Sequence, residues 1–225
     1  MRDNVTSGEW LRLAVAEGLG TALLVAAVIG SGIMGQKLAP GQPALILLAN
    51  SLATGAMLVA LIFTFGPVSG AHFNPLVTVA AALEGGIDRT RIVPYITAQV
   101  VGGIIGTIAA HFMFEMSLVS FAEVPRQGWS QQFSEALATF GLLLVILRTG
   151  DRASIVPPSV AGYIVAAYWF TSSTSFANPA VTIARAFSSS FAGIRVVDIL
   201  PFIGSQAVGA SLALHTHRFL SSKRA

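Results

Sequence analysis

The residues of this chain that could do chemistry are amides, carboxylates and an arginine set inside long apolar stretches. The run SFANPAVTIAR holds Asn178, Pro179 and Ala180, and it ends at Arg185. Asn is a favoured helix cap and Pro suits the first helical turn, so the run predicts a helix that starts at residue 178. An amide and the free N–H groups of a helix start are hydrogen-bond donors. They favour the recognition of a polar, uncharged molecule over bond-breaking chemistry.

A second run of this kind, HFNPLVTVA, holds Asn74, Pro75 and Leu76. The apolar pieces that begin at the two Asn-Pro pairs are 74–83 and 178–187. A helix of about ten residues covers about 15 Å, half of the hydrocarbon core of a membrane. We therefore expect two half-helices that enter the membrane from opposite sides and meet end to end.

The composition predicts a protein with several membrane spans. Of its 225 residues, 54% are hydrophobic and 10% are charged, whereas a soluble domain has about 25% charged residues. The segments apolar enough to span the membrane are 10–34, 44–65, 92–114, 133–147, 156–170 and 197–214. None of them alternates as the strands of a membrane barrel would. We expect an all-α membrane protein with six transmembrane helices and two re-entrant half-helices.

The polar residues recur in the same order in both halves of the chain. AEGLGTALLV, with Glu17, pairs with SEALATFGLLLV, with Glu135, and AQVVGG pairs with SQAVGA. Three spans in each half would invert the second half relative to the first. We expect a single domain over 1–225, built of inverted repeats at approximately 8–115 and 128–218, with the working site between them at the midplane.

The basic residues predict the orientation, because Lys and Arg are enriched on the cytoplasmic side. Under six spans, one side carries Arg2, Arg12, Arg89, Arg91, Arg148, Arg152, Arg218, Lys223 and Arg224. The other side carries Lys37, Arg126, Arg185 and Arg195. This difference predicts that both termini are cytoplasmic.

Other function classes have little support in the sequence. The chain has no cysteine, so it has no thiolate metal site, and its net charge of +3 indicates membrane topology rather than nucleic-acid binding. No catalytic triad, phosphate loop or metal-ligand cluster is found. We expect no enzymatic activity, no cofactor, no metal and no nucleic-acid partner.

Two Asn-Pro half-helices, each in a half that opens with a Glu-bearing helix, resemble the major intrinsic protein family, the aquaporins and aquaglyceroporins. The resemblance covers about residues 8–218, and Leu76 departs from the alanine usual in the family. It implies an aquaporin-like homotetramer in lipid, with one pore in each subunit. In that pore Asn74 and Asn178 would donate to small neutral solutes. The two helix starts, each with a charge of about +0.5, would repel cations and protons.

The resemblance also implies a selectivity filter near the outer mouth. One residue comes from the second helix, one from the fifth and two from the second re-entrant loop. In water-selective members these positions resemble Phe, His, a small residue and Arg; glycerol-permeable members have aromatic residues, Gly and Arg. Counting from the two Asn-Pro pairs places the filter at Thr54, Ala166, Ser175 and Val181. These small residues imply a wide filter that lacks the usual Arg and every aromatic side chain.

Arg185 follows Val181 by four residues, so it lies on the same helix face, about 6 Å further along the axis. Arg185 would be the usual filter Arg only if four residues were inserted into a half-helix whose start is set by Asn178. Otherwise, it forms an electropositive mouth in the outer vestibule, or it binds a loop carbonyl or a lipid headgroup.

Three further polar residues lie within or beside apolar segments. Glu17 and Glu135 could form a proton relay, but each could instead accept the backbone N–H groups of a re-entrant loop, and we favour this second role. His72 precedes the first half-helix. It could line the cytoplasmic vestibule as a pH gate, or be an ordinary hydrogen-bonded loop histidine.

The run YWFTSSTSFANPAVTIAR, with Thr54 on the second helix, resembles a bacterial subgroup of aquaglyceroporins associated with arsenic resistance. The resemblance implies a passive channel in the bacterial inner membrane for arsenite and other metalloid acids, glycerol-like polyols and water. A mainly water-selective aquaporin is an alternative that requires Arg185 to reach the constriction. A coupled transporter or an anion pathway is the second alternative.

Overall fold

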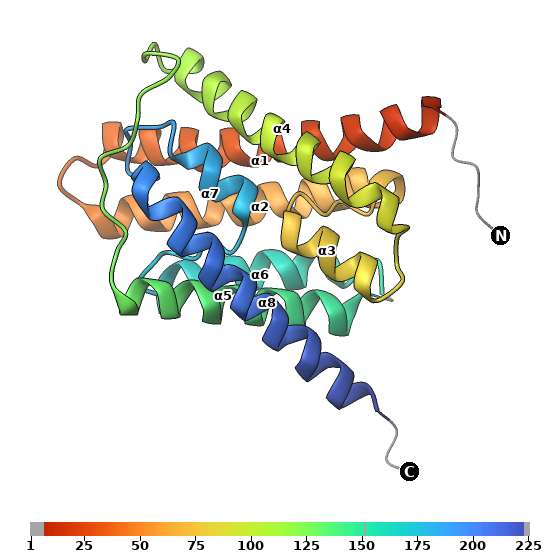
Figure 1. Cartoon of the computed structure of the whole chain (residues 1–225). Helices are drawn as coiled ribbons and strands as arrows, with labels where there is room; N and C mark the ends of the chain where they lie inside the picture. The colour runs from red at the N-terminus through yellow and green to blue at the C-terminus, as the bar shows by residue number, and fades with distance from the viewer. Residues whose placement is uncertain (1–6, 151, 223–225) are drawn as a thin grey trace.

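The computed structural model describes residues 7–150 and 152–222, which are helical apart from connecting loops (Figure 1). Arg2, Lys223 and Arg224, which enter the orientation prediction, lie outside the described residues. The long helices are α1 (Ser7–Leu38), α2 (Pro43–Ser69), α4 (Ile92–Met113), α5 (Trp129–Thr149), α6 (Val156–Phe170) and α8 (Ile199–Ser221). The short ones are α3 (Pro75–Leu83) and α7 (Pro179–Arg185), with 3-10 turns at Arg89–Arg91 and Val196–Asp198.

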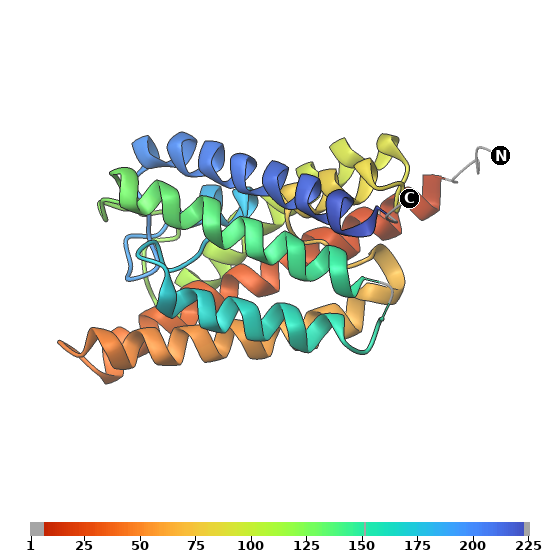
Figure 2. The ribbon, with the colours of Figure 1, turned by 90° about the horizontal axis from the view of Figure 1, so that it is seen from below.

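In the described part of the chain, five helices are long and apolar enough to cross a membrane: α1, α2, α4, α5 and α8. The fifth predicted span, α6, has the expected bounds but only 15 residues, which cover about 22 Å. It runs beside α2 and α5 and is shorter than both of them (Figure 2).

Helix ends differ from the predicted bounds where polar or special residues continue a helix. Helix α2 runs past Pro67 to Ser69 and ends at Gly70, whose φ of 90° is the left-handed conformation that glycine favours. Helix α5 begins at Trp129, four residues before the predicted start, because Ser and Gln extend it beyond the apolar run. Helix α7 ends at Arg185, so the second half-helix is shorter than predicted.

The second half of the chain repeats the element order of the first, with α5 to α8 following α1 to α4. Helices α1 and α5 run in opposite directions, and the short α3 and α7 approach each other near the middle of the molecule (Figure 1). Helix α1 packs against α4, and α5 packs against α8. The two half-helices are thereby held inside a frame of longer helices.

These two helix pairs touch through their backbones at glycines. A Cβ added to Gly102 would lie less than 3.0 Å from the carbonyl oxygen of Gly18, and one added to Gly209 would lie less than 3.0 Å from that of Ala136. Real Cβ contacts are longer than this. Small residues at such crossings let membrane helices pack by van der Waals contact.

We expect Gly102→Ala to lower the midpoint of thermal unfolding in detergent, because the new methyl group would push α1 away from α4. Overpacking of this kind costs about 1–3 kcal/mol. The matched control is Gly204→Ala in α8, where a Cβ would meet no atom of residues 7–150 and 152–222 within 4 Å. Equal midpoints for the two variants would contradict the backbone contact.

Candidate functional site: a cavity between the two halves

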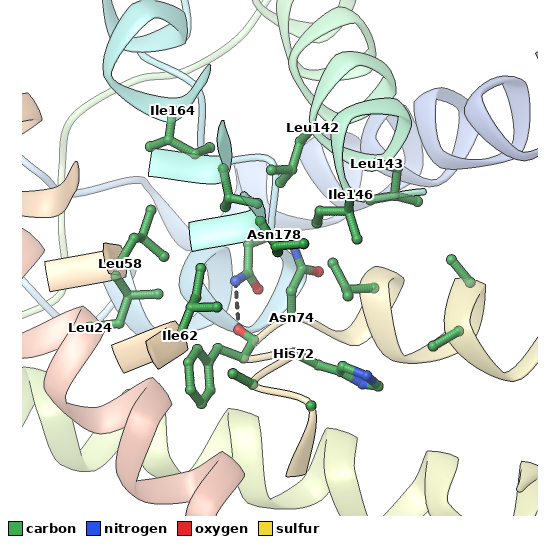
Figure 3. Close-up of a pocket in the computed structure, with 18 of the residues that line it drawn as sticks. Leu24, Leu58, Ile62, His72, Asn74, Leu142, Leu143, Ile146, Ile164 and Asn178 are labelled. Carbon is green, nitrogen blue, oxygen red and sulfur yellow. Dashed lines mark hydrogen bonds between the residues drawn. The ribbon is translucent and has the colours of Figure 1, made fainter. Parts of the chain in front are cut away.

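A cavity of about 580 Å³ lies between the two halves of the molecule. Its lining includes Asn74 and Asn178, which lie at the centre of Figure 3 with aliphatic side chains around them. The aliphatic side chains labelled there are those of Leu24, Leu58, Ile62, Leu142, Leu143, Ile146 and Ile164. Mostly apolar walls with a few placed polar groups are typical of small-molecule sites.

Asn74 and Asn178 cap the two half-helices. The Oδ1 atom of Asn74 accepts the backbone N–H of Leu76 at 3.0 Å, and that of Asn178 accepts the N–H of Ala180 at 3.0 Å and of Val181 at 3.3 Å. Both residues have extended backbones, as N-caps do. Capping fixes the direction of each amide group.

The same amides join the two re-entrant loops. Asn178 Nδ2 donates to the carbonyl oxygen of Phe73 at 2.8 Å (Figure 3), and Asn74 Nδ2 donates to that of Ala177 at 2.8 Å. An amide nitrogen carries two hydrogens, so each bond leaves one donor unused. Because both side chains line the cavity, these donors are available to a molecule inside it.

The residues beside the asparagines pack rather than line the cavity. Pro75, Pro179 and Ala180 are buried. Leu76 is half-buried and packs against a cluster formed by residues of α3, α5 and α8. Its extra bulk relative to alanine therefore lies on the flank of α3.

Glu17 holds the first re-entrant loop. It is fully buried, and its carboxylate accepts the backbone N–H groups of His72 at 3.0 Å and Phe73 at 2.7 Å. Ser69 Oγ donates to it at 2.6 Å and Gln99 Nε2 at 2.8 Å. Four donors on one carboxylate compensate for its burial in an apolar protein.

Glu135 does the same in the second half. It accepts the N–H groups of Phe176 and Ala177, both at 2.9 Å, and Gln206 Nε2 donates to it at 2.6 Å. The loop needs this support because Thr174, Ser175 and Ala177 have positive φ angles, which non-glycine residues rarely adopt. Both carboxylates are thus occupied by loop backbone, the arrangement favoured from the sequence.

Three of the four residues assigned to the filter line the cavity, namely Thr54, Ser175 and Val181. Ala166 does not: it is exposed on the outer face of α6, and Tyr168 lines the cavity instead. Tyr168 OH lies 3.2 Å from Thr54 Oγ1, within hydrogen-bond distance. The cavity therefore has an aromatic side chain beside Thr54, contrary to the sequence-based expectation.

The misplacement of Ala166 comes from counting back from Asn178 across a loop. Val160, Ile164 and Tyr168 follow one another at intervals of four and all line the cavity. That spacing marks one face of a helix. Helix periodicity, rather than distance along the chain, was the signal that could have identified Tyr168.

Arg185 lies in the last turn of α7 and is 2% exposed. Its Nε donates to the carbonyl oxygen of Ala192, and its guanidinium carbon lies 3.4 Å from the centre of the Phe176 ring. Arg185 also lines the cavity. It therefore binds a loop carbonyl and borders the cavity at the same time, and it is too buried to meet a lipid headgroup. Helix α7 holds both Val181 and Arg185 in one continuous helix.

A second arginine, which the sequence analysis did not select for the site, lies close by. The guanidinium carbon of Arg126 is 4.7 Å from the centre of the same Phe176 ring. Its Nε and Nη1 donate to the carbonyl oxygens of Gly193 and Ser173, both at 2.8 Å. Burial lowers the pKa of Arg126 to about 10, so it remains charged at neutral pH. No short-range motif connects Arg126 to a ring fifty residues away.

His72 and His217 line the cavity on the side of α3. His72 Nδ1 lies 3.1 Å from Thr78 Oγ1, and the His72 ring packs against Tyr95 with 5.4 Å between centroids. His217 Nε2 lies 3.9 Å from Oε2 of Glu84. The other carboxylate oxygen of Glu84 accepts a hydrogen bond from Arg218 Nε at 2.9 Å. His72 is thus a hydrogen-bonded loop residue that also borders the cavity.

The geometry agrees with comparisons to known proteins. The family model for the major intrinsic proteins matches residues 4–174. Over 211 residues the chain is 50% identical to the aquaglyceroporin AqpS of Rhizobium meliloti, covering 93% of this chain and 90% of that protein. It is 32% identical to the glycerol uptake facilitator protein-like 6 of Lactiplantibacillus plantarum, covering 95% and 100%.

Among solved structures, the aquaglyceroporin from Plasmodium falciparum has the same fold, with a TM-score of 0.67 at 19% identity over 93% of this chain and 95% of that one. The chain belongs to the major intrinsic protein family. It is an integral membrane protein with several spans, and a channel rather than an enzyme. The family resemblance inferred from the two Asn-Pro runs is confirmed.

Proposed function

We propose that the chain is a passive channel for small uncharged solutes: arsenous acid and related metalloid acids, glycerol-like polyols and water. The observation that carries this proposal is the cavity between the two halves, with two amide donors and mostly apolar walls. A neutral polyol can replace part of its hydration with these donors. A bare ion cannot, because burying an unpaired charge costs far more.

The small side chains at the positions assigned to the filter support solutes larger than water. Val181 stands three residues after Asn178, where the family has its filter arginine, and it lines the cavity with Thr54 and Ser175. At neutral pH arsenous acid is an uncharged polyol about the size of glycerol. The names of the two relatives described above, an aquaglyceroporin and a glycerol uptake facilitator-like protein, also favour a polyol pathway.

The proposal includes the setting of the channel. We assign it to a bacterial inner membrane with both termini in the cytoplasm, as the distribution of Lys and Arg indicates. We further propose one domain of two inverted repeats and a homotetramer with one pore per subunit. The matched hydrogen bonds of Glu17 with Gln99 and of Glu135 with Gln206 support the repeats.

The proposed function is tested by arsenite influx into proteoliposomes at neutral pH, with arsenic measured by elemental analysis and protein-free vesicles as the control. We expect faster influx that stops when the inside and outside concentrations are equal. Accumulation beyond equilibrium would instead support the coupled transporter. An influx equal to that of protein-free vesicles would refute arsenous acid as a solute.

A mainly water-selective channel is the second candidate, and two observations favour it. The Arg185 side chain borders the cavity, and Tyr168 adds an aromatic ring near Thr54. Both side chains are larger than those of the four residues inferred from the sequence to form the filter. Glycerol permeability no higher than that of protein-free vesicles, with rapid water flux, would establish this candidate.

A further inference from the structure

The guanidinium group of Arg185 has donors that the protein does not use. Its Nε donates to the carbonyl oxygen of Ala192. Neither Nη nitrogen has a hydrogen-bond partner among the described residues. A guanidinium carries five N–H donors, four of them on the Nη atoms. Arg185 is 2% exposed, lines the cavity and packs against the Phe176 ring. We therefore infer that these donors point toward the cavity.

Ser175 adds a second unused polar group. It is 3% exposed and lines the same cavity, and its buried Oγ atom has no hydrogen-bond partner among the described residues. A buried hydroxyl left unpaired costs about 1–3 kcal/mol, so it is ordinarily bonded to something. Ser175 also has a φ of 49°, and it is held in place by the loop that Glu135 supports.

We propose that the Nη atoms of Arg185 and the Oγ atom of Ser175 form a binding subsite for the hydroxyl groups of a neutral polyol or metalloid acid. The subsite replaces the donors that Val181 does not provide, from one turn further along α7. This inference rests on the proposed function and identifies the residues that would give it solute specificity.

The chemistry of the surroundings favours a hydroxylated neutral solute over an anion. Beyond the subsite the solute must pass aliphatic walls and the two asparagine amides, which an anion would cross without adequate hydrogen bonding. A cation is opposed by two guanidinium groups, since Arg126 lies against the same ring as Arg185. Adjacent hydroxyls, in contrast, can accept from the guanidinium and exchange a hydrogen bond with the serine.

The test compares glycerol and water permeabilities of proteoliposomes by stopped-flow light scattering for Arg185→Met and Ser175→Ala. Methionine keeps the length of the side chain and removes all its donors. We expect Arg185→Met to lower glycerol permeability about tenfold while water permeability changes less, because loss of charged donors raises the barrier for the hydroxylated solute. The matched control, Lys37→Met, removes a positive charge from the same end of the bundle, at an exposed residue that does not line the cavity.

If Arg185→Met does not fold, Ser175→Ala still tests the subsite. Removing a hydroxyl that bonds none of the described residues should leave the unfolding midpoint unchanged or higher, while glycerol permeability falls severalfold. Unchanged glycerol permeability in a folded variant would overturn the subsite. If the parent protein itself does not pass glycerol, the result refutes the proposed polyol pathway and not only the subsite. The two proposals can therefore be refuted separately.

Discussion

Val181→Arg is expected to lower glycerol permeability at least about tenfold, the effect of adding ~1.4 kcal/mol to the barrier. Val181 lines the cavity and is 6% exposed, in the first turn of a half-helix whose start is capped by Asn178. An arginine there would project its guanidinium into the same space as Thr54 and Ser175. It would narrow the passage and place a second guanidinium one turn from Arg185, so water should be affected less than glycerol.

The measurement is stopped-flow shrinkage and reswelling of proteoliposomes that contain equal amounts of parent and variant protein. Val181→Leu is the matched control, because it adds bulk without charge or donors, and we expect a smaller reduction. Glycerol permeability of Val181→Arg equal to that of the parent would show that Val181 does not border the narrowest part of the pathway.

Glu135→Gln is expected to reduce the yield and thermal stability of the folded channel strongly. The change turns one carboxylate oxygen into an N–H₂ donor that would face the donors of Phe176, Ala177 or Gln206. At least one buried donor would then lose its acceptor, at about 1–3 kcal/mol or more for a bond to a charged group. The strained loop that positions Ser175 and Asn178 would lose its support.

Monodispersity on gel filtration and the unfolding midpoint in detergent measure this effect. Glu115→Gln makes the same chemical change at an exposed loop residue and should resemble the parent. A Glu135→Gln protein as stable as Glu115→Gln would mean that the charge of Glu135 is not needed by the loop. In that case its persistence inside the membrane would require a transport role.

The fold was predictable from the sequence because its signals are local. Asn-Pro pairs fix the starts of α3 and α7, and apolar length finds the long helices. The paired carboxylates were predictable for the same reason, since an apolar helix that carries Glu17 needs donors nearby. Helix ends at Ser69 and Trp129 were missed because a Gly-Pro pair and polar residues continue the helices beyond the apolar runs.

The details of the cavity were less predictable because they depend on contacts between distant segments. Ala166 was misassigned, since its distance from Asn178 says nothing of which helix face turns inward. Arg126 meets Phe176 only after a long loop crosses the bundle. Arg185 binds a loop carbonyl, as one of the alternatives expected, and its place in an outer vestibule stays a prediction.

The ratio of glycerol to water permeability in parent proteoliposomes tests the central claim most directly. If the cavity between Asn74 and Asn178 is a pathway for small polyols, glycerol will enter many times faster than it enters protein-free vesicles, while water also passes. Rapid water flux with glycerol entry no faster than in protein-free vesicles would contradict the claim. The chain would then be a water channel in which Arg185 and Tyr168 leave too little room for glycerol.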